Sequence, residues 1–274
     1  MSDVQPSIAS IIPVLNESEY IGACLDSLIE QTLPPEQHMV LVLDGGSSDS
    51  TGDEVQKAIE RSKKRGGPLI ELHFNPKKHV AEARNLALTL LPDSVRYTVG
   101  MIGHSTVEPD HLELRMNEWS RIESSTPTPL AAVGIRVHPR QGKHGIVENW
   151  IEGTLASPLG SGNGQFESFT TSGPTKTPAF AMHSRTALED VGGWDTAYIT
   201  SQDSDLSMRL VDSGYAVYRT PATGVSMVKR SGLSKWWKMG HRYGFWRMKI
   251  LQKHPKRISL REFLPWIGFL LTLG

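Results

Sequence analysis

Apolar residues form two different patterns along the first hundred positions of the chain. Two continuous apolar stretches predict buried strands, SIASIIPVL at 7–15 and HMVLVLD at 38–44. Two further stretches, LIELHF at 69–74 and RYTVGMI at 96–102, predict a third and a fourth strand. Between them, apolar residues recur at the spacing of one helix face. The first of these helices is expected to bury the set Ile21, Cys24, Leu25, Leu28 and Ile29.

Strands and helices that alternate in this way predict an α/β fold. We expect a Rossmann-like, mostly parallel sheet flanked by helices, because short connections between alternating elements favour right-handed parallel crossovers. Strands that are apolar throughout agree, since helices cover both faces of parallel sheets. Asn16 is expected to cap the first helix, and Thr51 with Glu54 matches a capping box at the second.

The second half of the chain is less regular. Its patterns predict strands at 130–137, 179–184 and 215–221 and helices at 144–157, 186–195 and 203–214, with Gly214 ending the last of these. Residues 157–178 are rich in Gly, Ser and Thr and predict a long functional loop over a cleft. Residues 233–254 predict a basic, aromatic, amphipathic helix.

Composition and charge then narrow the class of protein. The chain has 274 residues, of which 38% are hydrophobic and 21% charged, so it is expected to be globular and ordered. The single cysteine, Cys24, excludes an intramolecular disulfide and fits a small core residue. The chain opens with no pattern of a secretory signal.

The net charge is zero, but its distribution is uneven. Residues 229–262 hold eleven Lys or Arg and one acidic residue, together with several tryptophans. This segment predicts contact with an anionic membrane surface or an anionic substrate, and no nucleic acid partner is expected. Residues 263–274 are apolar but too few to span a bilayer. They fit the start of a membrane segment, an interfacial anchor or a packed helix.

Asp44 is the first candidate for binding chemistry. It directly follows the second strand, and Gly45 and Gly46 allow a ligand to approach the backbone. Its carboxylate could accept hydrogen bonds from a base or a ribose, or it could cap its own turn. No dinucleotide fingerprint and no phosphate-binding loop of the G-K-[ST] type accompanies it.

Five motifs in order carry a resemblance to a known family. They are PVLNESEY at 13–20, LVLDGGSSDST at 41–51, the segment NPKKHVAEARN at 75–85, GGWD before SQDSDLSMRL, and GHRYGFWRMKILQKHP at 240–255. Together, from about residue 8 to 256, they resemble the family 2 glycosyltransferases, inverting enzymes of the GT-A fold. Membrane-associated members of the succinoglycan type are the most similar.

The resemblance implies a hexosyltransferase with a nucleotide-sugar donor, and a UDP-sugar is favoured. In that case Pro13, Leu15 and Glu17 line the nucleoside pocket, and Asp44 binds the base or ribose. Arg84 either helps to fix the nucleotide or is a surface arginine of its helix. His104 belongs to the same donor site and is a candidate metal ligand.

The resemblance also implies that Asp203 is the general base. Inverting transfer needs one group to take the proton of the acceptor hydroxyl, and Asp203 holds the matching position. Gln202 replaces the glutamate that usually precedes this aspartate. On the sequence alone, both Asp203 and Asp205 would be helix N-terminal carboxylates.

At the metal-binding position of the family, this chain departs from the usual sequence. The acids that normally hold Mg²⁺ or Mn²⁺ on the donor diphosphate are replaced by Gly103-His104-Ser105, and a further family histidine matches Val228. Three alternatives stay open: a metal-independent enzyme, a ligand role for Glu108 or Asp110, or a degenerate family member.

The basic segment offers cations that could replace the metal. The candidates for contact with the diphosphate or the acceptor are Gln202, Lys229, Arg230, Arg242, Tyr243, Trp246 and Arg247. Our hypothesis is that these cations do part of the metal's work, assisted by His104. Alternatively, these basic residues contact lipid head groups, and they can have both roles.

These inferences predict a domain division and a function. Residues 1–228 would form the GT-A domain, with a nucleotide-binding half at 1–105 and an acceptor half at 106–228, followed by a membrane-proximal segment at 229–274. The enzyme would transfer a sugar to a lipid-linked or growing glycan acceptor at the cytoplasmic face of the cell membrane. Two rivals are a degenerate member that only binds the donor and, less favoured, a nucleotidyltransferase.

Overall fold

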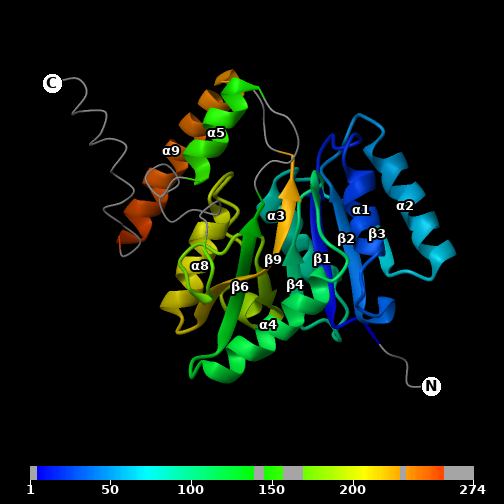
Figure 1. The fold of residues 1–274 in the computed structure, drawn as a ribbon, viewed down its shortest axis with the longest axis horizontal. Helices are drawn as coiled ribbons and strands as arrows, with labels where there is room; N and C mark the ends of the chain where they lie inside the picture. The colour runs from blue at the N-terminus through cyan, green and yellow to red at the C-terminus, as the bar shows by residue number, and fades with distance from the viewer. Residues whose placement is uncertain (1–4, 139–144, 157–168, 229–232, 256–274) are drawn as a thin grey trace.

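A computed structural model describes residues 5–138, 145–156, 169–228 and 233–255. The first half alternates strands and helices, as Figure 1 shows: β1 (Ile8–Val14), α1 (Ile21–Ile29), β2 (His38–Asp44), α2 (Thr51–Arg65), β3 (Leu69–Phe74), α3 (Val80–Leu90) and β4 (Tyr97–Gly100). The second half holds β5 (Ser105–Thr106), α4 (His111–Ser125), β6 (Leu130–Val137), α5 (Ile146–Ala156), β7 (Gly173–Pro174), β8 (Met182–Ser184), α7 (Arg185–Asp190), α8 (Gln202–Asp212), β9 (Ala216–Met227) and α9 (Leu233–Lys253).

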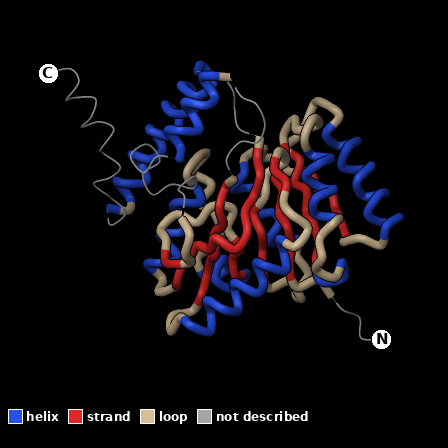
Figure 2. The backbone as a smooth tube through the Cα atoms, in the orientation of Figure 1, coloured by secondary structure: helices blue, strands red, loops and turns tan. Residues whose placement is uncertain are grey.

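One sheet forms the centre of the molecule, with helices on both sides (Figure 2). Its strand order is β3-β2-β1-β4-β8-β6-β9-β5. Neighbours among β1 to β4 are parallel, whereas β8 is antiparallel to both β4 and β6. The mostly parallel α/β fold predicted from the apolar runs is therefore confirmed.

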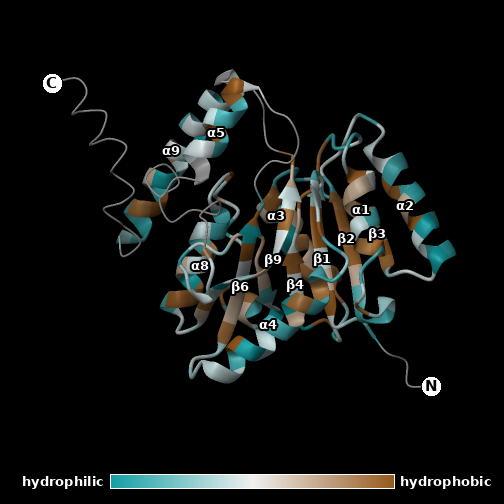
Figure 3. Cartoon of the chain, in the orientation of Figure 1, coloured by the Kyte–Doolittle hydropathy of each residue, from teal (hydrophilic) through white to brown (hydrophobic). Residues whose placement is uncertain are grey.

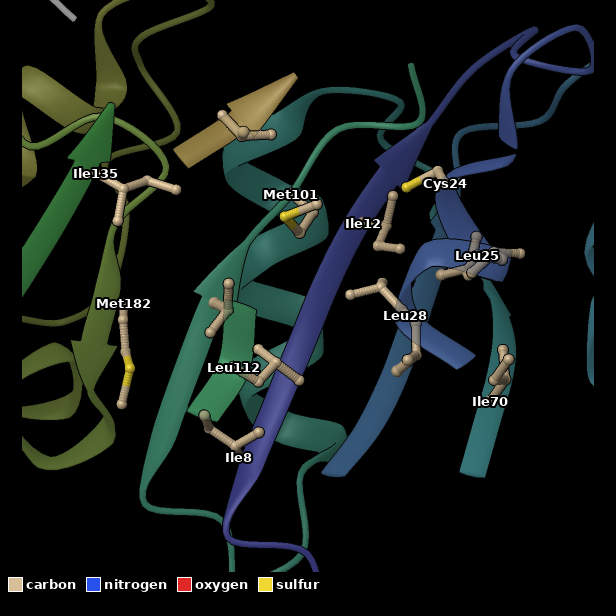
Figure 4. Packing of buried hydrophobic residues seen from close by; sticks show 14 of the residues in the cluster. Ile8, Ile12, Cys24, Leu25, Leu28, Ile70, Met101, Leu112, Ile135 and Met182 are labelled. Carbon is tan, nitrogen blue, oxygen red and sulfur yellow. The ribbon is translucent and has the colours of Figure 1, made fainter. Parts of the chain in front are cut away.

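Successive side chains of a strand point to opposite faces of the sheet, so each face packs against different helices. Ile8 and Ile12 of β1 pack with α1 and α4, whereas Ala9 and Ile11 pack with α3. Figure 4 shows Ile12 beside Cys24 and Leu28 of α1, and Figure 3 shows apolar strands behind helices with polar outer surfaces. Cys24 is fully buried, as expected of a core residue.

Two helix-capping predictions are wrong. The N-cap residues Tyr20 of α1 and Ser50 of α2 make no side-chain cap, and the backbone N–H of Thr51 donates to Asp49 instead. Asn16, which has a left-handed φ of 56°, instead accepts a hydrogen bond from the backbone N–H of Ser48. The Thr51 hydroxyl donates to Asp49 and accepts from the backbone N–H of Glu17. Both side chains thus tie the loop after β1 to the loop after β2, because these loops meet at the same sheet edge.

The long strand β9 extends beyond the predicted strand at 215–221. It continues to Met227 because Ser226 and Met227 pair with Thr106 and Ser105 of β5. In the other direction, Gly214 has the left-handed φ of 88° expected of the residue that follows a helix. Residues 157–168 of the predicted loop lie outside the described part of the chain.

Candidate active site

The carboxyl ends of β1, β2 and β4 form the edge that carries the predicted donor site. The chain runs from β1 to β2 and β3 on one side, then crosses to β4 on the other side of β1. Ligands of open α/β sheets bind outside the carboxyl ends at such a reversal of strand order. Pro13 is half-buried there, and Leu15 is exposed just beyond β1.

Asp44 closes its own turn at the end of β2. Its Oδ1 accepts hydrogen bonds from the backbone N–H groups of Gly46 and Ser47, and from the Ser47 hydroxyl at 2.7 Å. Gly46 has a φ of 87°, which a residue with a side chain rarely adopts. The turn orients the carboxylate, and its contacts all fall on one oxygen.

Arg84 and Asp203 lie together although 119 residues separate them. The Arg84 guanidinium donates to Asp203 Oδ1, which also accepts from the indole N–H of Trp194 at 3.0 Å. The Arg84 guanidinium carbon lies 5.4 Å from the centre of the Trp194 ring. About half of the Asp203 side chain stays exposed, and both hydrogen bonds fall on Oδ1, so Oδ2 can meet a substrate.

The turn before α8 is held from two sides. Asn85 of α3 accepts from the backbone N–H of Trp194 and donates to its carbonyl, at 2.8 and 2.7 Å. Arg209 of α8 donates to the carbonyls of Val191 and Gly193. No role was predicted for Trp194 or Asn85 from the sequence. Both lie within motifs that carry the family resemblance, GGWD and NPKKHVAEARN, which is the signal that could have found them.

A cleft opens beside Asp203 between β4, α3 and α8. Phe180 in its wall has a φ of 44°, and the carbonyl of Phe180 accepts a hydrogen bond from the buried Arg115. Burial lowers the pKa of Arg115 to about 9 and that of His183 in the cleft to about 4, so His183 is neutral at pH 7. The lining residues are Ile11, Arg84, Thr98, Gly100, Pro178, Phe180, Ala181, His183, Trp194, Asp203 and Ser207.

Glu17 and His104 form a second pair at the same sheet edge. His104 Nδ1 lies 2.9 and 3.1 Å from the two carboxylate oxygens of Glu17. The carbonyl of His104 accepts from the backbone N–H of Val228, which places Val228 beside the Gly103-His104-Ser105 stretch. The family resemblance matches Gly103-His104-Ser105 and Val228, but not Glu17, to the metal position.

The strand end at residues 103–105 offers a divalent metal one histidine, His104, and no carboxylate. In the ranges that the structure describes, no three His, Cys, Asp or Glu side chains are grouped to hold a metal ion. Glu108 and Asp110 do not replace the missing acids: the Glu108 carbonyl binds Gln31, beyond the far end of α1, and Asp110 begins α4. We therefore derive no step through a metal.

Helix α9 docks on α8 by its last turn. Asp205 is fully buried, and its carboxylate accepts from Arg209 at 2.7 Å, from Lys253 at 2.8 Å and from His254 at 2.9 Å. Burial alone would raise the pKa of Asp205, but the hydrogen bonds from Lys253, His254 and Arg209 outweigh it and hold the pKa below its usual value. Asp205 is thus a buried anchor and not a surface carboxylate at a helix start.

The remaining predicted residues are placed as follows. Trp246 packs against Tyr198, with ring centres 5.8 Å apart, and Arg242 and Tyr243 are exposed on α9. Arg247 is half-buried on the same helix, and Gln202 is buried at the start of α8. Lys229 and Arg230 lie outside the described residues. Through Trp246, Lys253 and the following His254, α9 contacts α8 and the turn before it, at the opposite end of the molecule from α2 (Figure 1).

Comparison with known proteins shows the family of the chain. The model of glycosyl transferase family 2 matches residues 10–192. A dolichyl N-acetyl-alpha-D-glucosaminyl phosphate 3-beta-D-2,3-diacetamido-2,3-dideoxy-beta-D-glucuronosyltransferase of Methanococcus voltae is 27% identical over 255 residues, 90% of this chain and 74% of the relative. The succinoglycan biosynthesis protein ExoA of Rhizobium meliloti is 26% identical over 255 residues, 93% of this chain and 73% of the relative.

Solved structures share the fold. The mannosyltransferase PcManGT from Pyrobaculum calidifontis, in complex with GDP-Man and Mn²⁺, aligns with a TM-score of 0.66 at 20% identity, over 95% of this chain and 68% of that one. TarS 1-349 of S. aureus, in complex with UDP-GlcNAc, aligns with a TM-score of 0.58 at 15% identity, over 82% and 59%. The fold is therefore that of the GT-A glycosyltransferases.

Proposed function

Since the chain belongs to glycosyl transferase family 2, we propose that it is an inverting transferase with Asp203 as its general base. It moves a sugar from a nucleotide-sugar donor to a hydroxyl of a lipid-linked or growing glycan acceptor. The acceptor oxygen forms a bond to the anomeric carbon while the bond from that carbon to the diphosphate breaks. The hydroxyl proton passes to Asp203, and the electron pair of the broken bond leaves with the nucleoside diphosphate.

The contacts of Asp203 are the observation that carries this proposal. Its carboxylate stands at the cleft, with Oδ1 held by Arg84 and Trp194 and half of the side chain open to a substrate. Two donors on one oxygen restrict the rotation of the carboxylate and direct Oδ2 away from them. A base held in this way can meet an acceptor hydroxyl without reorganisation. Arg84 acts here as a positioning residue, and this role replaces direct contact with the nucleotide.

The donor is proposed to lie along the strand ends. The oriented carboxylate of Asp44 meets the base or ribose, and Pro13, Leu15 and Glu17 flank the nucleoside. We favour a UDP-sugar. TarS is named with UDP-GlcNAc and PcManGT with GDP-Man, so the choice between uridine and guanosine needs measurement.

The acceptor is proposed to reach the site from a membrane. The names of two relatives, a transferase acting on a dolichyl phosphate sugar and a succinoglycan biosynthesis protein, support a lipid-linked or polymeric acceptor. Gln202, Arg242, Tyr243, Trp246 and Arg247 stay candidates for contact with the diphosphate or the acceptor.

Helix α9 presents the surface that would meet an anionic membrane. It contains no acidic residue, and Trp237, Phe245 and Met248 point outward with 80%, 54% and 54% of their surface exposed. Exposed apolar side chains beside cations favour binding to anionic lipid head groups. No helix in the described ranges is long and apolar enough to cross a bilayer. We propose that the enzyme works at the cytoplasmic face of the cell membrane.

The domain division stays a proposal that the sheet supports. β9 of the acceptor half pairs with β5 at the boundary near residue 105, and β8 pairs with β4. Residues 1–228 would therefore act as one GT-A domain with two halves, and residues 229–274 as a membrane-proximal segment.

The variant Asp203→Asn tests the assignment of the base. Asparagine keeps an oxygen for Arg84 and Trp194 but cannot take a proton, so kcat for transfer or donor hydrolysis should fall by about 10²–10⁴-fold with little change in donor KM. Asp212→Asn, at the other end of α8, is the matched control and should keep full activity. Loss of kcat of less than about threefold in Asp203→Asn would contradict the assignment. A wild type that binds donors from a UDP- and GDP-sugar panel but never turns them over would support the degenerate alternative.

A further inference from the structure

Helix α9 reaches both segments that hold the proposed base through one lysine. Lys253, in the last turn of α9, donates to Asp195 at 3.0 Å and to Asp205 at 2.8 Å. Asp195 directly follows Trp194 in the turn before α8, whereas Asp205 lies in the first turn of α8 with Asp203. A single ammonium group therefore joins the turn to the helix.

The turn and the helix meet at the base itself. Trp194 donates its indole N–H to Asp203 Oδ1 at 3.0 Å. The next side chain, Asp195, accepts from the backbone N–H of Ala197 through Oδ1 and from Lys253 through Oδ2, so both of its oxygens are bound. A shift of the turn relative to α8 would therefore change the hydrogen bond that orients Asp203.

The surroundings of Lys253 distinguish this contact from an ordinary surface ion pair. Its Nζ lies 5.2 Å from the centre of the buried Tyr198 ring, which packs against Trp246 of the same helix. His254, the next residue, is buried and lies 2.9 Å from Asp205. An exposed ion pair contributes little because both partners stay mobile, but these contacts fix the end of α9 on both segments.

We infer that Lys253 is a positioning residue for the general base and acts through Asp195 and the turn that carries Trp194. This inference rests on the proposed function. Lys253 holds the turn against α8, so the Trp194 N–H stays on Oδ1 of Asp203 and Oδ2 stays directed at the acceptor hydroxyl. Lys253 exchanges no proton and no bond in the reaction. Helix α9 is then part of the catalytic framework as well as the proposed membrane-facing segment.

Direct contact of Lys253 with a substrate is the competing explanation. Its side chain is 41% exposed, and an ammonium group can bind the diphosphate of the donor or an anionic acceptor. Contact with the donor would raise the donor KM, and contact with the acceptor would leave hydrolysis of the donor unchanged. Neither would depend on Asp195. The positioning role instead lowers kcat and requires Asp195.

Steady-state hydrolysis of a panel of UDP- and GDP-sugars by the full chain tests the inference. Lys253→Met and Asp195→Asn should each lower kcat about tenfold and change the donor KM less than about twofold. The double variant should lose no more than the stronger single variant, because both substitutions remove the same link. Lys253→Arg keeps the charge and can reach both carboxylates, so its kcat should stay within about threefold of the wild type.

Asp195→Asn also separates positioning from folding. Asparagine keeps an oxygen for the N–H of Ala197, and it leaves the contacts of Lys253 and His254 with Asp205 in place, so α9 stays docked. Thermal denaturation of each variant would show that it is folded at the temperature of the assay. If Lys253→Met does not fold, Asp195→Asn alone decides the question by its kcat.

Lys57→Met is the matched control. Lys57 pairs with Glu54 at 2.7 Å on α2, at the opposite end of the molecule from α9 (Figure 1), and its loss should leave kcat unchanged. An unchanged kcat in Asp195→Asn, additive losses in the double variant, an equal loss in Lys57→Met, or a higher donor KM at unchanged kcat would each overturn the inference. A wild type that hydrolyses no sugar of the panel, or an Asp203→Asn variant with full kcat, would instead overturn the proposed function.

Discussion

Two interpretations of the Asp205 carboxylate predict different losses in the free energy of unfolding when its charge is removed. A helix N-terminal carboxylate in solvent contributes about 0.3–1 kcal/mol through the helix dipole. Asp205 is instead fully buried and binds Arg209, Lys253 and His254. Removing one partner of a buried ion pair costs about 3–5 kcal/mol.

The structure places the cost of Asp205→Asn at the lower end of that range. Arg209 would keep its bonds to the carbonyls of Val191 and Gly193. Lys253 would keep Asp195 at 3.0 Å, and 41% of its side chain is exposed. Only His254 would lose its main charged partner. We therefore expect a loss of about 3 kcal/mol in the free energy of unfolding.

Thermal and urea denaturation measure this loss. At roughly 2–4 °C per kcal/mol for a chain of this size, Tm should fall by about 6–12 °C. Asp53→Asn is the control, because Asp53 is an exposed carboxylate in the first turn of α2 and should cost less than about 1 kcal/mol. Equal and small losses in both variants would refute the reasoning and return Asp205 to the role of a dipole-compensating surface acid.

The same carboxylate predicts a dependence on pH. The pKa of Asp205 in the folded protein is below the usual 3.8, so the unfolded chain binds the proton more readily. Its stabilisation is therefore complete above pH 3.8 and is lost as pH falls through the folded pKa. The difference in unfolding free energy between wild type and Asp205→Asn should stay constant from about pH 7 to 5 and shrink below about pH 4.

Three further predictions concern the cleft, the surface and the core. Arg84→Met should lower kcat up to about 100-fold with little change in donor KM, because Asp203 loses its orientation; a selective rise in KM would point to nucleotide contact instead. Trp237→Ser should weaken binding to vesicles that contain anionic lipid, measured by sedimentation, and unchanged binding would exclude this side chain from the membrane surface. Burial raises the pKa of Cys24 to about 12, so thiol reagents should modify it only after unfolding, and rapid labelling of the native protein would contradict its burial.

Local patterns in the sequence determined the first half of the fold. The stretches that predicted strands became β1 to β4. β1 and β2 are buried, as continuous apolar strands covered by helices on both faces should be, whereas β3 is the edge strand and exposes Leu69 and Phe74. Asp44 appeared at the end of β2 as expected, since strand direction alone decides which edge it occupies. The order of the motifs was enough to indicate the family, and the family model agrees.

Local pattern was misleading where tertiary contacts compete for the same polar groups. Asn16 and Thr51 had the right residue types and spacing to cap helices. The loops after β1 and β2 lie close together, so Asn16 instead accepts from the backbone N–H of Ser48 and Thr51 from that of Glu17. A capping rule that counts residues along one helix cannot predict a hydrogen bond between two loops.

Only the tertiary structure decided which charged groups share a site. Arg84 meets Asp203 across 119 residues, Glu17 meets His104 across 87, and His254 meets Asp205 across 49. Each pairing depends on how the crossovers bring strand ends and helix ends together, and no local period records this. The sequence by itself therefore determined the elements, the family and the absence of acids at residues 103–105. The fold decided that a carboxylate-bound histidine stands there, because only the neighbouring ends of β1 and β4 bring Glu17 to His104.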